Sequence, residues 1–339
     1  MADKTKVTIY DLAQRLNTTA STVSRALQNN PRISPKMRKA VQELAAELNY
    51  IPDPVAHHLR TGKGNVLCII VPRIDRNFFA TIISSFQKTA QKQNYNIIIA
   101  ASNESPEDEA AAVKALLSKK VDGIAISLAS KTVEPKYEEL CNNYNTPLVY
   151  FDRSPESCST DTVTNDNFQI GYDAVIQLHR RGCQKIGHFA GPMVQRVYKE
   201  RFEGYKKALI DLKLEICDKY LYENCITMET GTETAMKILS TSDRPNAIFS
   251  SGDFSAITAM NIFQKKGLRI PEDIAIIGVA NEPFDNYLST PLASFDLHEQ
   301  RIGELAADIL LERISNKENP SEPQHIIVKH DLILRDSAI

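Results

Sequence analysis

The sequence lacks the long apolar run and the leader that membrane insertion or export would require. Its longest apolar runs, such as Val66 to Val71, fall far short of the roughly 18 residues of a transmembrane helix. The first eight residues contain no apolar stretch typical of a secretory signal. The six cysteines form no Cys-x-x-Cys pair, which argues against a zinc ribbon or a redox dithiol and suits reduced thiols. We therefore expect a cytoplasmic protein without a membrane partner.

Signatures of catalysis are also missing. The chain contains no GxxxxGK[ST] loop, no GxGxxG and no GxSxG. His298 and Glu299 begin the zinc-protease pattern HExxH, but Ile302 stands where the second histidine must be. The pair His57 and His58 has no third ligand nearby in the sequence. We therefore expect a protein that is not an enzyme and has no cofactor and no metal site.

Charge is distributed unevenly along the 339 residues, a length that suits two or three domains. Residues 1–60 carry nine Lys and Arg against five Asp and Glu, whereas the remainder carries 31 against 37. A small basic head on an acidic body is typical of a nucleic-acid-binding segment fused to another domain, although a solvated surface would give the same charge.

Three short helices with recognisable caps are predicted in the first fifty residues. Thr8 and Asp11 resemble a capping box before a helix over 9–16. Thr19 is placed to cap a second helix over 20–28, and Ser34-Pro35 marks the start of a third that Pro52 ends. Two helices joined by a short turn form a helix-turn-helix, whose second helix enters the DNA major groove. An ordinary three-helix bundle accounts equally well for the spacing.

From Val66 onward, β-rich apolar runs alternate with amphipathic helical stretches. The predicted strands span residues 66–71, 96–101, 123–128, 147–151, 185–190, 247–250 and 274–279. Strict alternation implies βαβ units and parallel sheets covered on both faces, and the length is enough for two such lobes. Polar residues follow several strands, where open α/β sheets bind ligands. Structural roles remain open for these residues: Asp166 and Asp253 stand where helix caps are needed, and Asp152 could form an ion pair with Arg153.

Motifs along nearly the whole chain resemble the LacI/GalR family of bacterial repressors. In the head they are Val7-Thr8-Ile9-Tyr10-Asp11-Leu12-Ala13, Ser21-Thr22-Val23-Ser24-Arg25-Ala26-Leu27, Ile33-Ser34-Pro35 and Leu48-Asn49-Tyr50-Ile51-Pro52. In the body they are Phe78-Phe79, Val121-Asp122-Gly123, Phe151-Asp152-Arg153, Gly182 to Gly187, Arg201-Phe202-Glu203-Gly204-Tyr205 and Ile270-Pro271-Glu272-Asp273. The resemblance implies a small all-α helix-turn-helix head on an α/β body like periplasmic sugar-binding proteins, with two doubly wound parallel-sheet lobes.

The resemblance also implies domain boundaries and DNA contacts. The head would span residues 1–52, a hinge helix and linker 53–64, and an effector-binding and dimerisation domain 65–339. Its N-lobe would comprise about 65–165 and 296–322, and its C-lobe about 166–295 and 323–339. Major-groove and phosphate contacts would come from Thr19, Ala20, Ser21, Thr22, Ser24, Arg25 and Gln28, with Arg25 as the main base reader. The hinge would enter the minor groove through Val55, Ala56, His58 and Leu59, with Leu59 as a wedge.

For the body, the resemblance implies a small-molecule effector between the lobes. The contacts carried over are Asp75, Phe78, Asp152, Arg153, Gln195, Arg201, Ile226, Asp253 and Asn281. Ala280, Ile226 and Gln195 depart from common patterns of the family, and Gln195 disfavours a purine. The expected protein is a homodimeric repressor that reads a pseudo-palindromic operator and responds to a sugar, sugar acid or sugar phosphate. A transport binding protein and a sugar-modifying α/β enzyme are the alternatives, opposed by the head and by the missing phosphate loop respectively.

Overall fold

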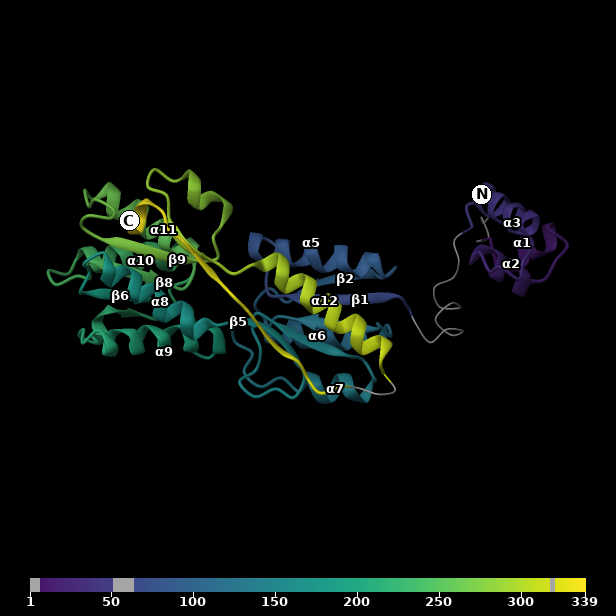
Figure 1. Ribbon diagram of the computed structural model, residues 1–339, viewed down its shortest axis with the longest axis horizontal. Coiled ribbons are helices and arrows are strands. Elements are labelled where there is room, and N and C mark those ends of the chain that lie inside the picture. The colour runs from purple at the N-terminus through teal and green to yellow at the C-terminus, as the bar shows by residue number, and fades with distance from the viewer. Residues whose placement is uncertain (1–6, 51–63, 318–320) are drawn as a thin grey trace. The chain divides into compact units, whose positions relative to one another are not determined.

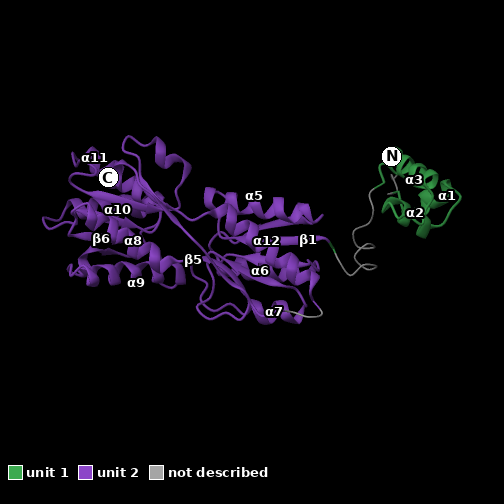
Figure 2. Ribbon diagram, in the orientation of Figure 1, with its two compact units in different colours: residues 1–64 green, residues 65–339 purple. Residues whose placement is uncertain are grey.

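The chain divides into two compact units, residues 1–64 and residues 65–339 (Figure 2). The computed structural model describes residues 7–50, 64–317 and 321–339. Each unit has its own hydrophobic core. No helix among these described residues is long and apolar enough to cross a membrane.

The head unit is a bundle of three helices, α1 (Ile9–Arg15), α2 (Ala20–Leu27) and α3 (Pro35–Glu47). The predicted caps are present. The carboxylate of Asp11 accepts the Thr8 backbone N–H at 2.7 Å, Thr19 Oγ1 accepts from Thr22 N at 3.2 Å, and Ser34 Oγ accepts from Met37 N at 3.3 Å. These bonds satisfy backbone donors that a helix start leaves unpaired. The helices bury one small core of Leu12, Ala13, Val23, Ala26, Val41 and Ala45.

The body contains two six-stranded sheets, which confirms the predicted fold class. The N-lobe sheet has the order β11-β5-β4-β3-β1-β2, and all its strand pairs are parallel. Its strands are β1 (Val66–Val71), β2 (Asn96–Ala101), β3 (Gly123–Ile126), β4 (Leu148–Phe151), β5 (Asp161–Asn165) and β11 (His325–Val328).

The C-lobe sheet has the order β12-β10-β9-β8-β6-β7 and is parallel except for the β10–β12 pair at one edge. Its strands are β6 (Ile186–Phe189), β7 (Leu221–Tyr222), β8 (Ala247–Ser250), β9 (Ala275–Val279), β10 (Ala293–Asp296) and β12 (Asp331–Ile333). β5, β10 and β11 lie next to the segments through which the chain passes between the lobes (Figure 1).

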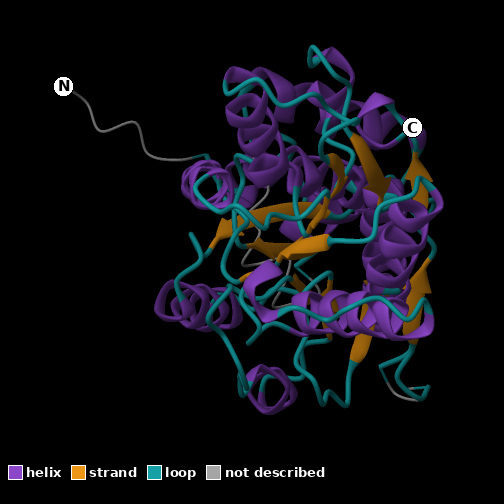
Figure 3. Ribbon diagram, turned by 90° about the vertical axis from the view of Figure 1, so that its left-hand side faces the viewer, coloured by secondary structure: helices purple, strands orange, loops and turns teal. Residues whose placement is uncertain are grey.

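Helices cover both faces of each sheet, and the strands lie between them (Figure 3). The N-lobe helices are α5 (Asn77–Lys92), α6 (Pro106–Ser118), α7 (Tyr137–Asn143) and α12 (Glu299–Ser315). The C-lobe helices are α8 (Asn167–Arg180), α9 (Arg196–Asp211), α10 (Met228–Leu239) and α11 (Asp253–Lys265). Because both faces are covered, strands such as β1 and β9 are apolar along their length rather than alternating.

Glycine sets the close packing of the C-lobe helix pair α8 and α9. A Cβ on Gly204 would lie 1.9 Å from the carbonyl oxygen of Phe168, and one on Gly171 would lie 2.0 Å from that of Arg201. Both distances are far below van der Waals contact, so the two helix backbones can touch only without side chains at these positions. This contact fixes the start of α9, where Tyr198 and Arg201 reach the pocket described below.

The structure corrects the lobe boundary and adds elements. The second N-lobe segment was expected to end at residue 322, but β11 pairs with β5 and therefore extends the N-lobe to Val328. The added elements, which were not expected from the sequence, are the helices α7 and α12 and the strands β5, β7, β10, β11 and β12. Most of these strands are short or lie at sheet edges, where an apolar run of strand length is not required.

Candidate functional site

The outer face of α2 carries the side chains expected to contact DNA. Thr19, Ser21, Arg25 and Gln28 are exposed, and Ala20, Thr22 and Ser24 are half-buried. The hydroxyls of Thr19, Ser21 and Thr22 form a cluster at the helix start, with oxygen separations of 2.9 and 3.0 Å. The side chain of Arg25 makes no hydrogen bond or ion pair with another described residue, so its guanidinium is available to an external acceptor. A helix N-terminus bearing hydroxyls suits phosphate, and a free arginine suits a guanine edge.

The predicted minor-groove residues lie outside the described residues. They are Val55, Ala56, His58 and Leu59, and the departure at His57 also falls there. The hinge therefore stays a prediction.

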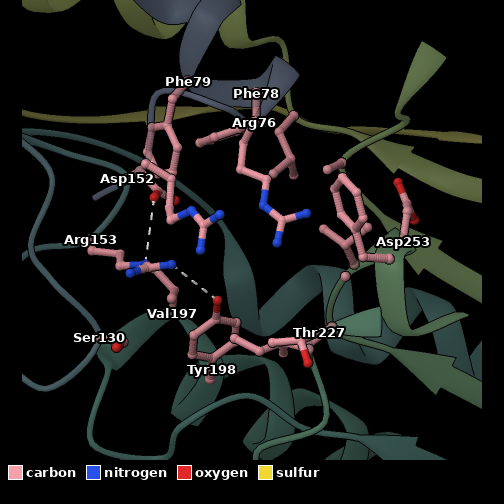
Figure 4. A pocket seen from close by; sticks show the side chains of 18 of the residues that line it. Arg76, Phe78, Phe79, Ser130, Asp152, Arg153, Val197, Tyr198, Thr227 and Asp253 are labelled. Carbon is pink, nitrogen blue, oxygen red and sulfur yellow. Dashed lines mark hydrogen bonds and ion pairs between the residues drawn. The ribbon is translucent and has the colours of Figure 1, made fainter. Parts of the chain in front are cut away.

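A cavity of about 270 Å³ lies between the two lobes at the carboxyl ends of their strands. Its volume corresponds to roughly nine water molecules, which is at the small end of ligand sites. The N-lobe and the crossing segments beside it contribute Arg73, Arg76, Phe78, Phe79, Glu104, Ser130, Asp152, Arg153 and Leu297 to the lining. The C-lobe side is lined by Pro192, Val197, Tyr198, Arg201, Ile226, Thr227, Ser251, Gly252, Asp253, Phe254, Val279, Ala280 and Glu282. Ten of these side chains are labelled around the cavity in Figure 4.

Six of the nine predicted effector contacts line this cavity: Phe78, Asp152, Arg153, Arg201, Ile226 and Asp253. The other three do not. Asp75 is exposed and pairs with Arg73, and the buried Gln195 amide donates to the carbonyl oxygens of Ala129 and Thr132 at 2.9 and 2.7 Å. Asn281 is held between Asp296 and Arg335. Their polar groups are engaged by the protein, so these three residues lie outside the cavity lining, and their contact with an effector stays a prediction.

Arg153 is the centre of an ion-pair network on the N-lobe side. Its Nη1 lies 2.9 Å from Glu104 Oε2, and its Nη2 donates to Tyr198 Oη at 3.4 Å across the cavity (Figure 4). Burial opposes the charge, but Tyr198 and Glu104 outweigh burial and raise the pKa of Arg153 above its usual value. The expected pairing of Asp152 with Arg153 is present but long, at 4.0 Å. Burial raises the pKa of Asp152, and the charge of Arg153 opposes that rise.

Arg201 is buried in the C-lobe wall. Its Nε donates to Asn167 Oδ1 and its Nη1 to the carbonyl oxygen of Ser251, both at 2.9 Å. Burial lowers the pKa of this guanidinium, although the nearby Tyr198 opposes the effect. Part of its donor capacity is therefore used to anchor the loop after β8, which carries Asp253.

The buried acids Asp253 and Glu282 form another part of the C-lobe wall, and a third buried acid, Asp285, lies behind it. Asp253 begins α11 but does not cap it; its carboxylate accepts from Ser294 Oγ at 2.8 and 3.0 Å and from Glu282 N at 3.2 Å. Glu282 Oε2 and both carboxylate oxygens of Asp285 are buried and have no hydrogen-bond partner apart from a proton that Asp285 can share with Asp253. Burial and the charge of Asp253 raise the pKa of Glu282 to about 7 and that of Asp285 to about 9. This wall can therefore accept hydrogen bonds from ligand hydroxyls.

Backbone strain accompanies the same wall. Ala280 lines the cavity with φ of 117°, a conformation that residues with a side chain rarely adopt. Such strain costs about 1–3 kcal/mol and is concentrated at functional sites. Asp166, by contrast, is a structural cap: its carboxylate accepts from Gln169 N at 2.9 Å. Within residues 7–50, 64–317 and 321–339, no group of three or more His, Cys, Asp or Glu side chains is arranged to hold a metal ion.

Several residues that line the cavity were not expected from the sequence, because they are brought together only by the folding of the chain. Arg73 and Arg76 follow the first strand but are not among the effector contacts expected from the sequence. Glu104, Tyr198, Phe254 and Glu282 had no local signal. Glu104 and Glu282 lie three residues beyond the ends of β2 and β9, and Tyr198 and Phe254 lie in the first turns of α9 and α11, positions that could have indicated them.

Comparison with known proteins agrees with this architecture. Residues 8–53 match the family described as bacterial regulatory proteins, lacI family, and residues 64–336 match periplasmic binding proteins and sugar binding domain of LacI family. A transcriptional repressor named PurR from Pasteurella multocida is 31% identical over 97% of this chain and 98% of its own, and one from Actinobacillus pleuropneumoniae serotype 3 is 30% identical over the same shares.

Solved structures show the same fold. The lac repressor dimer bound to operator and an anti-inducer superposes with a TM-score of 0.87 at 22% identity, covering 98% of this chain and 99% of that one. The transcription regulator CcpA of Lactococcus lactis gives 0.74 at 25% identity, with 81% and 99% covered. The chain therefore belongs to the lacI family of bacterial regulatory proteins, DNA-binding transcriptional regulators that a small-molecule effector controls.

Proposed function

We propose that this protein is a homodimeric repressor of carbohydrate-related genes, acting on chromosomal DNA in the cytoplasm. Two heads would each contact one half-site of a pseudo-palindromic operator, because a two-fold dimer presents two equivalent recognition helices. The observation that carries the proposal is that one chain contains both of two features. The first is an exposed face of α2 that bears hydroxyl groups and the unpaired side chain of Arg25. The second is a polar cavity between the two lobes of the body.

The effector proposed for the cavity is a sugar or a sugar-derived acid or phosphate. The family's description of residues 64–336 as a sugar binding domain supports this class. Asp253 and Glu282 supply acceptors for hydroxyl groups, and Phe78 and Tyr198 supply apolar ring surface. The ligand would act as a signal rather than as a substrate. Product formed from candidate sugars in a turnover assay would contradict that role.

The mechanism proposed for control is a population shift of the two lobes. A ligand that contacts both walls binds one lobe arrangement more tightly than others, and only such a difference can shift the equilibrium. The predicted hinge over residues 53–64 would couple that arrangement to the heads. A thermal-shift screen with sugars, uronates and sugar phosphates would find the effector, because a ligand that binds only the folded state raises its melting temperature. A stabilising compound that leaves operator affinity unchanged would contradict the coupling.

Base reading by Arg25 is tested on an operator selected in vitro from random DNA. Arg25→Ala should weaken binding by about 1–3 kcal/mol and relax base preference at one position of each half-site. Fluorescence anisotropy on a set of single-base operator variants measures both effects. Arg32→Ala is the matched control, because it removes the same charge from the exposed segment between α2 and α3. An unchanged preference profile for Arg25→Ala would contradict the assignment.

A further inference from the structure

Three of the four arginines that line the cavity are already engaged by the protein. Arg73 forms a two-pronged ion pair with Asp75, with Nε to Oδ1 at 2.8 Å. Arg153 is bound to Glu104 and to the carbonyl oxygen of Leu128. Arg201 donates to side-chain and backbone oxygens of its own lobe. Their guanidinium groups therefore hold the walls together and have few donors left for a ligand.

Arg76 differs from these three. It immediately precedes α5, lines the cavity and extends into it (Figure 4). Among the described residues its guanidinium makes no hydrogen bond and no ion pair. Its one recorded contact is with the ring of Phe254, whose centroid lies 3.7 Å from the guanidinium carbon. A guanidinium stacked on a ring keeps its in-plane N–H groups free, so they can still bind a carboxylate or phosphate with two parallel hydrogen bonds.

The stacked pair joins the two lobes. Arg76 comes from the loop between β1 and α5, and Phe254 is the second residue of α11. Phe254 is itself held by an edge contact with Phe284, with ring centroids 5.3 Å apart. The guanidinium is thus positioned by packing before any ligand arrives, which reduces the entropy lost on binding.

The charge of Arg76 is not neutralised by the acids of the cavity. Glu104 is paired with Arg153, and Asp253 is occupied by Ser294 and by the Glu282 N–H. Glu282 senses Arg76 through space, but its pKa of about 7 leaves it partly protonated near neutral pH. The starts of α5, α9, α10 and α11 also border the cavity, and the positive ends of helix dipoles favour an anion there.

We propose that the effector carries an anionic oxygen group, a carboxylate or a phosphate, that Arg76 binds as a fork while Phe254 supports the guanidinium from behind. The remainder of the ligand extends toward Asp253 and Glu282, which accept its hydroxyl groups. Arg76 is the specificity-determining residue for the charged group, in place of Arg153 and Arg201. The inference rests on the proposed function, because it names the class of ligand for the same cavity.

Inorganic phosphate is the probe, used with the full chain at constant ionic strength against chloride. Phosphate should raise the melting temperature of the wild type in a saturable way, and isothermal titration should give a dissociation constant. Arg76→Gln should weaken phosphate binding at least tenfold, in line with a charge-assisted bidentate contact, and Arg76→Lys should retain part of it. Arg180→Gln, an exposed change on α8, is the matched control and should bind as the wild type does.

A second arm compares glucuronate with glucose to separate a carboxylate from a phosphate preference. The proposal is supported if the wild type binds either anion and Arg76→Gln weakens that binding. A wild type that phosphate and glucuronate stabilise no more than chloride does, or an Arg76→Gln variant that binds both anions as the wild type does, overturns it. If Arg76→Gln does not fold, Arg76→Lys and the glucuronate-to-glucose affinity ratio of the wild type still decide. Operator binding is measured in parallel with and without anion; its absence under both conditions would refute the regulator function while leaving the anion result intact.

Discussion

The two lobes of the body share a fold but treat their buried carboxylates differently. In the N-lobe, Glu109 accepts hydrogen bonds from the Ala129 backbone, Thr132 and Tyr137, and Asp161 is bound by Arg313 and by the Gln324 backbone. In the C-lobe, the buried oxygens of Glu282 and Asp285 lack such donors. A satisfied buried carboxylate fixes structure, whereas an unsatisfied one costs stability and is left available for a proton or a ligand.

This difference follows from where the acids lie. Asp161 and Glu109 do not line the cavity; Asp161 ties a strand to α12, and Glu109 ties a helix to the loop after β3. Glu282 lies in the cavity wall and Asp285 lies behind it. In the N-lobe, Asp161 and Glu109 are thus used in structural contacts. In the C-lobe, Glu282 and Asp285 lie at or behind the ligand site with unsatisfied oxygens. Three substitutions test the contrast.

The largest effect is expected for Arg313→Ala. It removes the two hydrogen bonds at 2.9 and 2.7 Å that hold Asp161, whose side chain is 5% exposed. A buried charge left without its partner costs about 3 kcal/mol or more in free energy of unfolding. Denaturant unfolding of the body measures it. Arg301→Ala on the same helix is the control, since its pair with Glu304 is exposed and should contribute less than about 1 kcal/mol. Equal losses for the two variants would show that burial is not the cause.

A smaller loss is expected for Glu109→Gln. The new amide keeps one oxygen but places an NH₂ donor against another donor, which should cost about 1–3 kcal/mol in free energy of unfolding. Burial raises the pKa of Glu109, although its three hydrogen bonds oppose that rise. Glu134→Gln, in an exposed loop, should change stability by less than about 0.5 kcal/mol. If Glu109→Gln left the free energy of unfolding unchanged, the contrast between the two lobes would be contradicted.

The smallest effect, and one of opposite sign, is expected for Glu282→Gln. Because the pKa of Glu282 is raised to about 7, the folded state holds its proton more tightly than the unfolded chain, and wild-type stability falls as pH rises from about 4.5 to 7. The variant has no such loss. Its stability relative to the wild type should therefore increase by about 1 kcal/mol between pH 6 and pH 7.

Unfolding curves at these two pH values measure that change, and Asp285 is present in both proteins, so its own titration enters both curves. Glu272→Gln is the control, because Glu272 is exposed in the same lobe. A relative stability that is flat or falls with pH would mean that Glu282 is as well satisfied as Glu109, and the contrast between the lobes would fail.

Local patterns predicted the head well because its helices are specified locally. Thr8, Thr19 and Ser34 each mark a helix start within three residues of the donor or acceptor they bind. The same holds for the apolar strands β1 and β9, which are buried on both faces and need no distant partner to be recognised. β5, with the sequence Asp-Thr-Val-Thr-Asn, was missed because the partners of its polar ends are distant in the sequence: Arg313 and the Gln324 backbone for Asp161, and the Leu297 and Val328 carbonyl oxygens for Asn165.

The cavity was predicted less completely than the head. Asp75, Gln195 and Asn281 are polar residues in suitable places, but each has a partner inside the protein that the sequence does not show. α12 has a clear apolar spacing in Ile302, Ala306 and Leu310, yet only packing on α5 places it in the N-lobe.

The sequence by itself determined the class of the molecule: a three-helix head with a reading face, and a body of alternating strands and helices whose strand ends are polar. Caps, apolar spacing and β-rich runs act over a few residues, so they can be recognised in the linear chain. Only the tertiary structure decided which arginine is unpaired and which carboxylates are unsatisfied. Those properties depend on partners more than a hundred residues away, such as Arg76 with Phe254, and on the burial that the two lobes impose together.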